Sequence, residues 1–321
     1  MSSAVGVDLG GTKMLAGVVD ASGSVLYRAS DLDFGDTAER ILDELEEAVR
    51  EALEASGGAE VVGLGIPCTM DRERGFAISA VNLPLVNVPV RDLMRERLGL
   101  PVFVDNDANL AMLAEHRHGA ARGTRNAMLL TIGTGIGGGM VLGGEVYRGS
   151  TGAAAELGHV VVDENGPRCQ GNCPNRGCVE TMASGTALAR DGRAAAERAP
   201  DSALGRLLAA GQQIDGRAVT AAAIGGDDVA REVVETAGRH IGVALASLAN
   251  AFEPEVFVLG GGVMAAGELL LDPARAELRA RALPPMNEVP VVAAELGPDA
   301  GMVGAATMAL EESRTAAGTR N

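Results

Sequence analysis

The chain has 321 residues, and at roughly 150 residues per domain this length favours two domains. Hydrophobic residues make up 47% and charged residues 22%, which is enough apolar material for a packed core and excludes a wholly disordered chain. The net charge of -16 and the aromatic content of 2% argue against nucleic acid and anionic membranes as partners, because proteins that bind phosphate backbones present a basic face.

The N-terminal segment and the cysteines indicate a cytoplasmic protein. No run of about 18 uncharged apolar residues is present, so no transmembrane helix is expected. No basic stretch precedes the apolar residues that begin at Val5, so no signal peptide is expected. Three of the four cysteines lie close together, which is typical of a cytosolic metal site rather than of a disulfide framework.

Three glycine-rich turns each follow a short apolar run that predicts a buried strand. The predicted strands are residues 5–9, 128–132 and 256–259, and the turns after them are residues 10–13, 133–139 and 260–262. After each of the first two turns the sequence predicts a hairpin that ends in Tyr-Arg, at Arg28 and at Arg148. We interpret this repeat, at a separation of about 120 residues, as a duplicated domain whose glycine turns face one cleft.

Predicted helices separate the strands. Residues 37–54 predict an amphipathic surface helix, and residues 108–117 predict a helix directly after a strand at 102–104. Further helices are expected within residues 186–223, at 230–252 and at 301–312, before a frayed polar tail at 313–321. Alternating strands and helices with two hairpins predict an α/β fold with mixed sheets.

The glycine turns are suited to phosphate. Glycine lets consecutive backbone N–H groups approach an anion closely. The spacing of Gly133, Gly135 and Gly138 also fits a dinucleotide fingerprint, and Glu156 lies near the distance at which a nicotinamide-dependent dehydrogenase carries its ribose-binding acid. That interpretation needs a helix after the third glycine, whereas a strand and hairpin are predicted there.

Acidic and amide side chains follow two of the predicted strands. Asp8 ends the first strand, where a carboxylate could hold Mg²⁺ directly or through water, or could cap the turn. Residues 105–109 read Asp-Asn-Asp-Ala-Asn, which is more polar groups than a helix cap needs. A carboxylate in this turn could accept a proton from a hydroxyl nucleophile.

The remaining cysteines and one histidine have the composition of a structural zinc site. His159, Cys169, Cys173 and Cys178 would form a closed Cys₃His tetrahedron, and the residues between them are turn formers. Cys68 stands apart beside Pro67 and is expected to be a small buried residue.

Taken together, these motifs resemble the ROK family of bacterial sugar kinases and regulators, over nearly the whole chain. The resemblance rests on the first phosphate turn at 8–13, on Asn106-Asp107-Ala108-Asn109, on the second turn at 133–139, on Glu156-x-Gly158-His159, on Gly260-Gly261-Gly262 and on the zinc motif ending in Cys178-x-Glu180. It implies a two-lobed fold of the hexokinase–actin, ribonuclease H-like type. The small lobe would be residues 1–117, completed by the helix at 301–312, and the large lobe residues 118–300.

The resemblance also implies roles for individual residues. Asp107 would be the general base, and Asp8 would hold magnesium. The sugar hydroxyls would be bound by Asn82, Asn106, Asp107, Glu156, His159 and Glu180. ATP would be bound by Gly10, Gly11, Thr12, Lys13, Thr134, Gly135, Gly261 and Gly262. His159 would serve both the zinc and the sugar.

Two departures from the family pattern stand out. Three residues separate Cys169 from Cys173 where the family usually has one, so the knuckle must be reshaped. Cys68 follows Gly65-Ile66-Pro67 where many members have glycine. Repressors of the family carry an N-terminal helix-turn-helix, for which the strand beginning at Val5 leaves no room.

We therefore expect an ATP-dependent kinase for the 6-hydroxyl of a hexose, most like a bacterial glucokinase, and a homodimer. The cofactors would be ATP, Mg²⁺ and structural Zn²⁺. Fructose, mannose, allose or N-acetylmannosamine are the alternative sugars. A non-catalytic sugar sensor is a further alternative, although Asp8, Asp107 and all three glycine turns are present.

Overall fold

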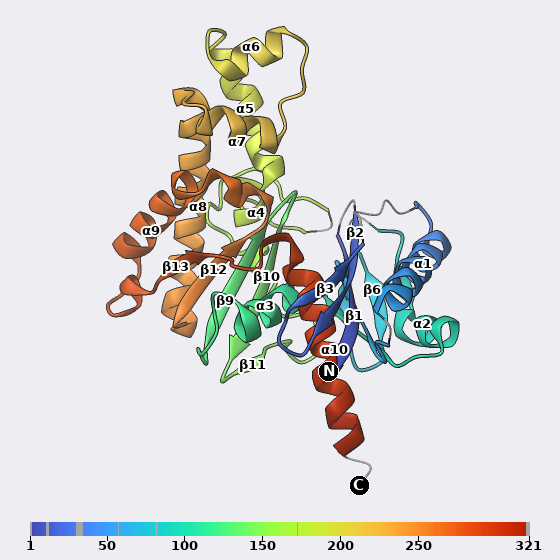
Figure 1. The fold of residues 1–321 in the computed structure, drawn as a ribbon. Coiled ribbons are helices and arrows are strands. Elements are labelled where there is room, and N and C mark those ends of the chain that lie inside the picture. Colours follow the sequence, from blue (N-terminus) through green and yellow to red (C-terminus); the bar gives the residue numbers. More distant parts are fainter. Residues whose placement is uncertain are drawn as a thin grey trace. The chain divides into compact units, whose positions relative to one another are not determined.

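Two five-stranded sheets repeat one order of strands in the computed structural model (Figure 1). The model describes residues 2–10, 13–29, 35–56, 58–80, 83–171 and 173–318. The first sheet has the order β3-β2-β1-β4-β8, and the second has the order β11-β10-β9-β12-β13. In both sheets the hairpin strands pair antiparallel and the strands beyond them pair parallel. The predicted α/β fold with duplicated, mixed sheets is confirmed.

The strands of the two sheets correspond one to one. The first sheet consists of β1 (Ser3–Leu9), β2 (Met14–Asp20), β3 (Val25–Arg28), β4 (Val62–Ile66) and β8 (Val102–Asn106). The second consists of β9 (Ala127–Ile132), β10 (Ile136–Leu142), β11 (Glu145–Val146), β12 (Val256–Gly260) and β13 (Val291–Ala293). Strand β10 starts inside the second glycine turn. A strand rather than a helix therefore follows that turn, which contradicts the dehydrogenase interpretation.

By contacts, the chain divides into two compact units. The first unit comprises Met1–Gly123, Gly139–Ala155 and Glu295–Asn321, and the second comprises Thr124–Gly138 and Glu156–Ala294. The lobe boundaries expected from the sequence remain a prediction.

Helices cover the first sheet on both faces. They are α1 (Ala38–Ser56), α2 (Val90–Leu98), α3 (Asp107–His118) and α10 (Ala300–Gly318). Val5 and Val7 share a core with Ile41 and Leu45 of α1, while Gly6 between them faces α10. A Cβ at Gly6 would lie 2.1 Å from the Met302 carbonyl oxygen, so glycine is what lets α10 pack directly on the β1 backbone.

Helix α10 is longer than the sequence predicted. It was expected to end at Glu312 but continues to Gly318. Thr315 donates a hydrogen bond to the Glu311 carbonyl, and Arg314 donates one to Ser2 at 3.1 Å. No proline or glycine interrupts residues 313–317, so the polar composition alone did not end the helix.

A third sheet in the first unit was not expected. It contains β5 (Thr69–Asp71), β6 (Phe76–Ser79) and β7 (Val86–Val88). These strands are too short to give a periodic signal in the sequence.

Helices make up most of the second unit (Figure 1). Its helices are α4 (Val179–Ala183), α5 (Gly185–Arg198), α6 (Ala203–Ala209), α7 (Gly216–Ile224), α8 (Asp228–Phe252) and α9 (Glu268–Arg281). Single-turn helices are η1 (Leu157–His159), η2 (Gly262–Ala266) and η3 (Met286–Glu288), and η4 (Gly297–Asp299) precedes α10 in the first unit. The predicted long helix is α8, which packs against α4, α5, α7 and α9. None of the helices in the described part of the chain has the length and hydropathy that crossing a bilayer requires.

Candidate active site

Asp8 is a buried ionisable group of the first unit. It lies at the end of β1, and its Oδ1 atom is buried and makes no hydrogen bond. Burial and, to a smaller extent, the negative charge of Asp107 together raise the pKa of Asp8 to about 7. Gly301 at the start of α10 lies against this carboxylate, since a Cβ there would be 2.3 Å from Oδ2. A divalent cation would supply the missing positive charge, so the residues present fit magnesium.

The chain turns from β8 into α3 at Asn106. Its backbone is extended, and its Oδ1 accepts hydrogen bonds from the N–H groups of Ala108 at 3.0 Å and Asn109 at 3.2 Å. This is a helix N-cap, and it makes Asp107 the first residue of α3. A carboxylate there is favoured by the helix dipole. The Asn106 Nδ2 donates to the Cys68 carbonyl at 3.4 Å, so one amide hydrogen remains for a ligand.

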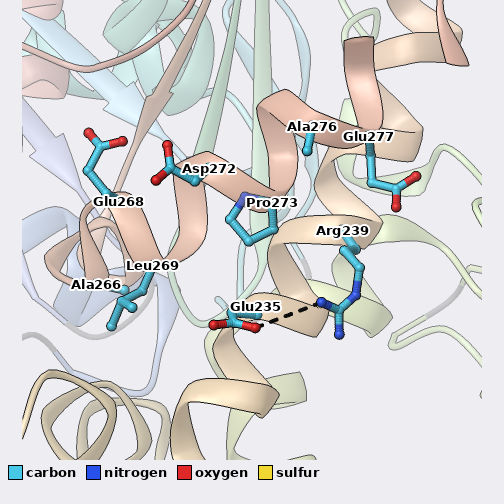
Figure 2. A pocket seen from close by; sticks show the side chains of 9 residues that line it. All are labelled: Glu235, Arg239, Ala266, Glu268, Leu269, Asp272, Pro273, Ala276 and Glu277. Atoms are coloured by element: carbon cyan, nitrogen blue, oxygen red, sulfur yellow. Dashed lines mark ion pairs between the residues drawn. The ribbon is translucent and has the colours of Figure 1, made fainter. Parts of the chain in front are cut away.

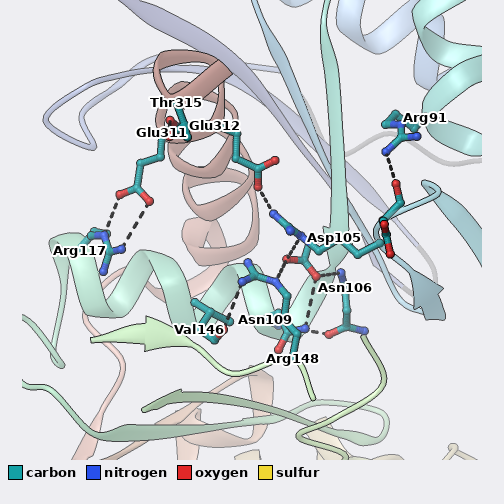
Figure 3. A network of polar contacts seen from close by, with 12 residues as sticks. Arg91, Asp105, Asn106, Asn109, Arg117, Val146, Arg148, Glu311, Glu312 and Thr315 are labelled. Atoms are coloured by element: carbon teal, nitrogen blue, oxygen red, sulfur yellow. Dashed lines mark hydrogen bonds and ion pairs between the residues drawn. The ribbon is translucent and has the colours of Figure 1, made fainter. Parts of the chain in front are cut away.

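The two carboxylates of this turn have different environments. Asp105 is buried, and its Oδ2 accepts a hydrogen bond from Arg148 Nε at 2.6 Å and forms an ion pair with Arg72 Nε at 3.2 Å. Its Oδ1 also accepts from the backbone of Asn106 and from the side chain of Asn109 (Figure 3). Asp105 is thus engaged in structural contacts, and Asp107 is the candidate for proton transfer.

The first and third glycine turns are held by backbone contacts. In the first, the Gly10 N–H donates to the Lys13 carbonyl at 2.8 Å. Gly11 and Thr12 lie outside the described residues. In the third, Gly261 has a φ of +90°, and a Cβ there would be 2.5 Å from the Ile132 carbonyl oxygen. Gly262 is the first residue of η2.

The second turn is fastened to the start of α5. The Gly133 carbonyl accepts from the Gly185 N–H at 2.7 Å, and the Thr134 carbonyl accepts from the Thr186 hydroxyl at 2.8 Å. With these carbonyls engaged, the shape of the turn is set before any ligand binds.

The four predicted zinc ligands meet in the second unit. The ligand atoms of His159, Cys169, Cys173 and Cys178 all lie within 4.8 Å of one another. The Cys169 sulfur is 3.5 Å from His159 Nδ1, and the Cys173 and Cys178 sulfurs are 3.9 Å apart. Sulfur and nitrogen at zinc-ligand distance on a tetrahedron would be separated by about 3.5–3.8 Å. The donor set and its spacing therefore fit zinc.

The longer spacing between the first two cysteines is absorbed by a turn. The Cys173 N–H donates to the Gln170 carbonyl at 3.3 Å, and the Cys169 N–H donates to the Asn175 carbonyl at 2.9 Å. Gly177, with a φ of +60°, lies against Asp163 where no side chain would fit. Burial raises the pKa of the Cys169 thiol to about 12, so a thiolate there needs a neighbouring cation.

Two of the predicted sugar-binding residues, Glu156 and Glu180, flank the zinc ligands in sequence, and a third, His159, is one of those ligands. The Glu156 Oε2 lies 4.0 Å from His159 Nε2, the ring nitrogen opposite the one that faces Cys169. Burial raises the pKa of Glu156, while His159 lowers it and Glu180 raises it again. Glu180 Oε2 accepts from the Ile136 N–H at 2.9 Å. Asn82, which was predicted to join this set, lies outside the described residues.

The sequence analysis missed the link between Glu180 and the second glycine turn. A Cβ at Gly135 would be 2.5 Å from Glu180 Oε2, so the missing side chain at Gly135 makes room for this carboxylate. Helix α4, which follows the last zinc ligand directly, therefore carries an acid that contacts the second turn.

Glu115 is a second residue that sequence reasoning missed. It is fully buried on α3, and its carboxylate accepts from the N–H groups of Ala120 at 2.8 Å, Glu295 at 3.2 Å and Leu296 at 2.9 Å. The only sequence signal for this contact was the position of Glu115 on the apolar side of the predicted helix. Glu115 joins the end of α3 to the segment that leads into α10.

A cavity of about 560 Å³ lies away from these residues, between α8 and α9 (Figure 2). Its charged lining is mainly acidic, with Glu235, Glu268, Asp272 and Glu277 against Arg239. This charge does not suit phosphate.

The chain matches the model of the ROK family over residues 4–312. It is 39% identical to a glucokinase of Streptomyces coelicolor, with 97% of this chain and 98% of that protein covered. It is 38% identical to a glucokinase of Thermotoga maritima, with 96% and 97% covered. The structure of a ROK family glucokinase from Streptomyces griseus in complex with glucose and AMPPNP matches at a TM-score of 0.87 and 39% identity, covering 97% of this chain and 100% of that one. The family model covers nearly the whole chain and the relatives match over nearly their full length, so the chain belongs to the ROK family.

Proposed function

We propose that this protein is an ATP-dependent hexose kinase that converts glucose to glucose 6-phosphate. The observation that carries the proposal is the likeness, over the full length of both chains, to a ROK glucokinase solved with glucose and AMPPNP. The Asp8–Asp107 pair and the Cys₃His cluster supply the chemistry that such a reaction needs.

In the proposed reaction Asp107 accepts the proton of the sugar 6-hydroxyl. The hydroxyl oxygen then bonds to the γ-phosphorus of ATP, the bond to the bridging oxygen breaks, and ADP leaves with that electron pair. Magnesium, held by Asp8 directly or through water, would neutralise phosphate charge. Catalysis of this kind is mostly positioning, and the N-cap at Asn106 gives Asp107 a defined place.

The glycine turns would bind ATP. Their N–H groups suit phosphate oxygens, and the bonds to Gly185 and Thr186 keep the second turn in shape. We assign ATP contacts to Gly10, Gly11, Thr12, Lys13, Thr134, Gly135, Gly261 and Gly262.

Zinc held by His159 and the three cysteines would be structural, because all four positions of the tetrahedron are filled by protein ligands. The knuckle would then hold His159 and Glu180 in place for the sugar, together with Asn82, Asn106 and Glu156.

The sugar preference follows from the chemistry of these side chains. Glu156 and Glu180 accept hydrogen bonds when ionised, so they suit free ring hydroxyls better than an N-acetyl group. Each buried polar group left unpaired by a wrong sugar would cost about 1–3 kcal/mol. Specificity therefore rests on hydroxyl positions rather than on aromatic stacking, since the chain has no Trp.

The test is ADP production, measured by a coupled assay, with glucose, mannose, fructose, allose, N-acetylglucosamine and N-acetylmannosamine. We expect the highest kcat/KM for glucose, with mannose or fructose weaker and N-acetylmannosamine poor. An N-acetylated sugar or fructose that leads by about tenfold or more would replace glucose as the substrate. Absence of ADP production with every sugar would refute the proposed kinase activity.

We further propose that the enzyme is a cytoplasmic homodimer. The family resemblance supports the assembly, and the net charge of -16 fits a protein that does not associate with anionic membranes.

A further inference from the structure

An ion-pair network with one buried carboxylate, Asp105, adjoins the turn that carries the proposed base. Asp105, the penultimate residue of β8, is paired with Arg148 from the segment after β11 and with Arg72 from the turn between β5 and β6 (Figure 3). Arg72 also pairs with Glu312 of α10. All four residues belong to the first unit. Two separate segments therefore converge on the Asp105 carboxylate, and α10 joins them through Arg72.

The geometry around Asp105 restricts the turn that carries Asp107. The Asp105 side chain is 2% exposed, and its Oδ2 receives both arginines. Its Oδ1 accepts from the Asn106 N–H at 2.8 Å and from Asn109 Nδ2 at 3.3 Å. The same carboxylate therefore binds the N-cap residue of α3 on one oxygen and two guanidinium groups on the other.

Arg148 is held on both sides of this contact. Its Nε donates to Asp105 Oδ2 at 2.6 Å, and its Nη1 donates to the Val146 carbonyl at 3.2 Å. The guanidinium is thus anchored to β11 and cannot follow a moving carboxylate without losing a bond. Charge-assisted bonds of this length are among the stronger hydrogen bonds in proteins.

We propose that Arg148 is a positioning residue for phosphoryl transfer, which holds the Asn106–Asp107 turn in its reactive geometry through Asp105. This rests on the proposed kinase function. Arg72 completes the charge balance from the opposite side. Arg148 itself contacts neither proton donor nor phosphate in this scheme, and it acts only through Asp105.

The charges around Asp105 predict that loss of Arg148 changes the pH dependence of kcat as well as the stability of the protein. The charged and titratable groups near Asp105 are Arg72, Arg148 and the Cys68 thiol, with Glu312 reached through Arg72. Asp107 itself interacts with Asp8 and with the Cys68 thiol. Loss of Arg148 leaves more negative charge beside Asp107. This raises the pKa of Asp107, so the base stays protonated to higher pH and the acid limb of kcat moves upward.

The experiment compares Arg148→Met with wild type as the full-length, zinc-containing enzyme. The substrate is the hexose that wild type turns over fastest, so a wrong choice of sugar does not affect the comparison. We expect kcat to fall by about tenfold or more, KM for the sugar to change by less than about threefold, and the acid limb of kcat to shift to higher pH. Arg148→Lys should return the acid limb of kcat to its wild-type position but should recover only part of the wild-type kcat. The reason is that an ammonium group replaces the charge without the planar geometry of the guanidinium.

Arg117→Met is the matched control. Arg117 pairs with Glu311 of α10 at 2.7 Å and is as exposed as Arg148, but it lies at the opposite end of α3 (Figure 3). Its loss should lower the melting temperature while kcat stays within about twofold and the pH profile is unchanged. If Arg148→Met behaves like Arg117→Met, Arg148 is only a structural contact and the proposal is wrong. Wild-type enzyme that turns over no hexose refutes the proposed function itself and this inference with it.

Discussion

The two copies of the repeated sheet have the same strand order but carry different chemistry where their first strands end. In the first copy, β1 ends with Asp8, a carboxylate whose Oδ1 is buried and unbonded. In the second copy, Thr131 holds the corresponding register, since Asp8 pairs with Gly65 of β4 and Thr131 pairs with Gly260 of β12. The same strand arrangement thus carries an acidic side chain at this position in the first copy and a neutral side chain in the second.

The Tyr-Arg sequences at the ends of the two hairpins show a second difference. Arg28 of β3 pairs at 3.0 Å with Asp299, just before α10, and Arg148 after β11 pairs at 2.6 Å with Asp105, just before α3. Asp299 is 29% exposed and Asp105 is 2% exposed. An exposed pair contributes about 0–1 kcal/mol, whereas a buried carboxylate depends strongly on its partners. Loss of the arginine is therefore expected to matter more for the pair at Asp105, two residues before Asp107.

The largest expected effect is the loss of activity when the proposed base, which only the first copy carries, is removed. Asp107→Asn keeps the shape of the first turn of α3 but removes the proton acceptor, so kcat should fall by roughly 10²–10⁴-fold. The assay is steady-state turnover with glucose and ATP on protein whose circular dichroism matches wild type. A folded variant with near-normal turnover would show that Asp107 is not the base.

The next test concerns the predicted zinc ligands of the second unit. Cys173→Ala removes one of the four ligands, so the content of one zinc per chain and the binding of sugar should be lost together, with kcat/KM falling by roughly 10²-fold. Metal analysis and glucose titration measure the two effects.

Cys68→Ala is the control for that experiment, because Cys68 is a buried cysteine outside the cluster. It should retain one zinc per chain. If Cys173→Ala binds glucose normally without metal, the knuckle does not position the sugar-binding residues.

The smallest expected effect is a change in stability. It follows from replacing the Asp8 carboxylate by a neutral side chain, so that the first copy, like the second with Thr131, carries no charge at this position. Folding raises the pKa of Asp8 from 3.8 to about 7, so the folded state binds this proton more tightly than the unfolded state. The associated stability is complete below pH 4 and is lost as pH rises through about 7. In magnesium-free buffer at pH 8, Asp8→Asn should therefore raise the melting temperature by about 2–4 °C, although it lowers activity.

Asp20→Asn gives the opposite sign in the same sheet. Hydrogen bonds from Ser22 and Ser24 lower the pKa of Asp20, so its ionised form favours folding above its unfolded pKa and loses this effect as pH falls. The variant should melt below wild type at pH 8. Equal shifts for Asp8→Asn and Asp20→Asn would show that Asp8 carries no buried charge.

Much of the site could be predicted because its residues are local in sequence. Asp107 follows a strand directly, and the zinc ligands lie within a short segment of turn formers. Chain geometry alone brings such residues together. The contact of Glu180 with the Ile136 N–H could not be predicted in this way, because it joins residues 44 positions apart through packing of α4 on the second turn.

The sequence by itself determined the repeated strand–turn–hairpin units, the α/β class and the identities of the acids and thiols. Periodicity and turn chemistry act over a few residues and are visible in any stretch of chain. Only the tertiary structure decided which of the two neighbouring aspartates is paired with arginines. Arg72 and Arg148 come from distant segments and neutralise Asp105, while Asp107 at the start of α3 lies beside Asp8. Burial and charge pairing across segments set those roles, and neither is encoded in local sequence.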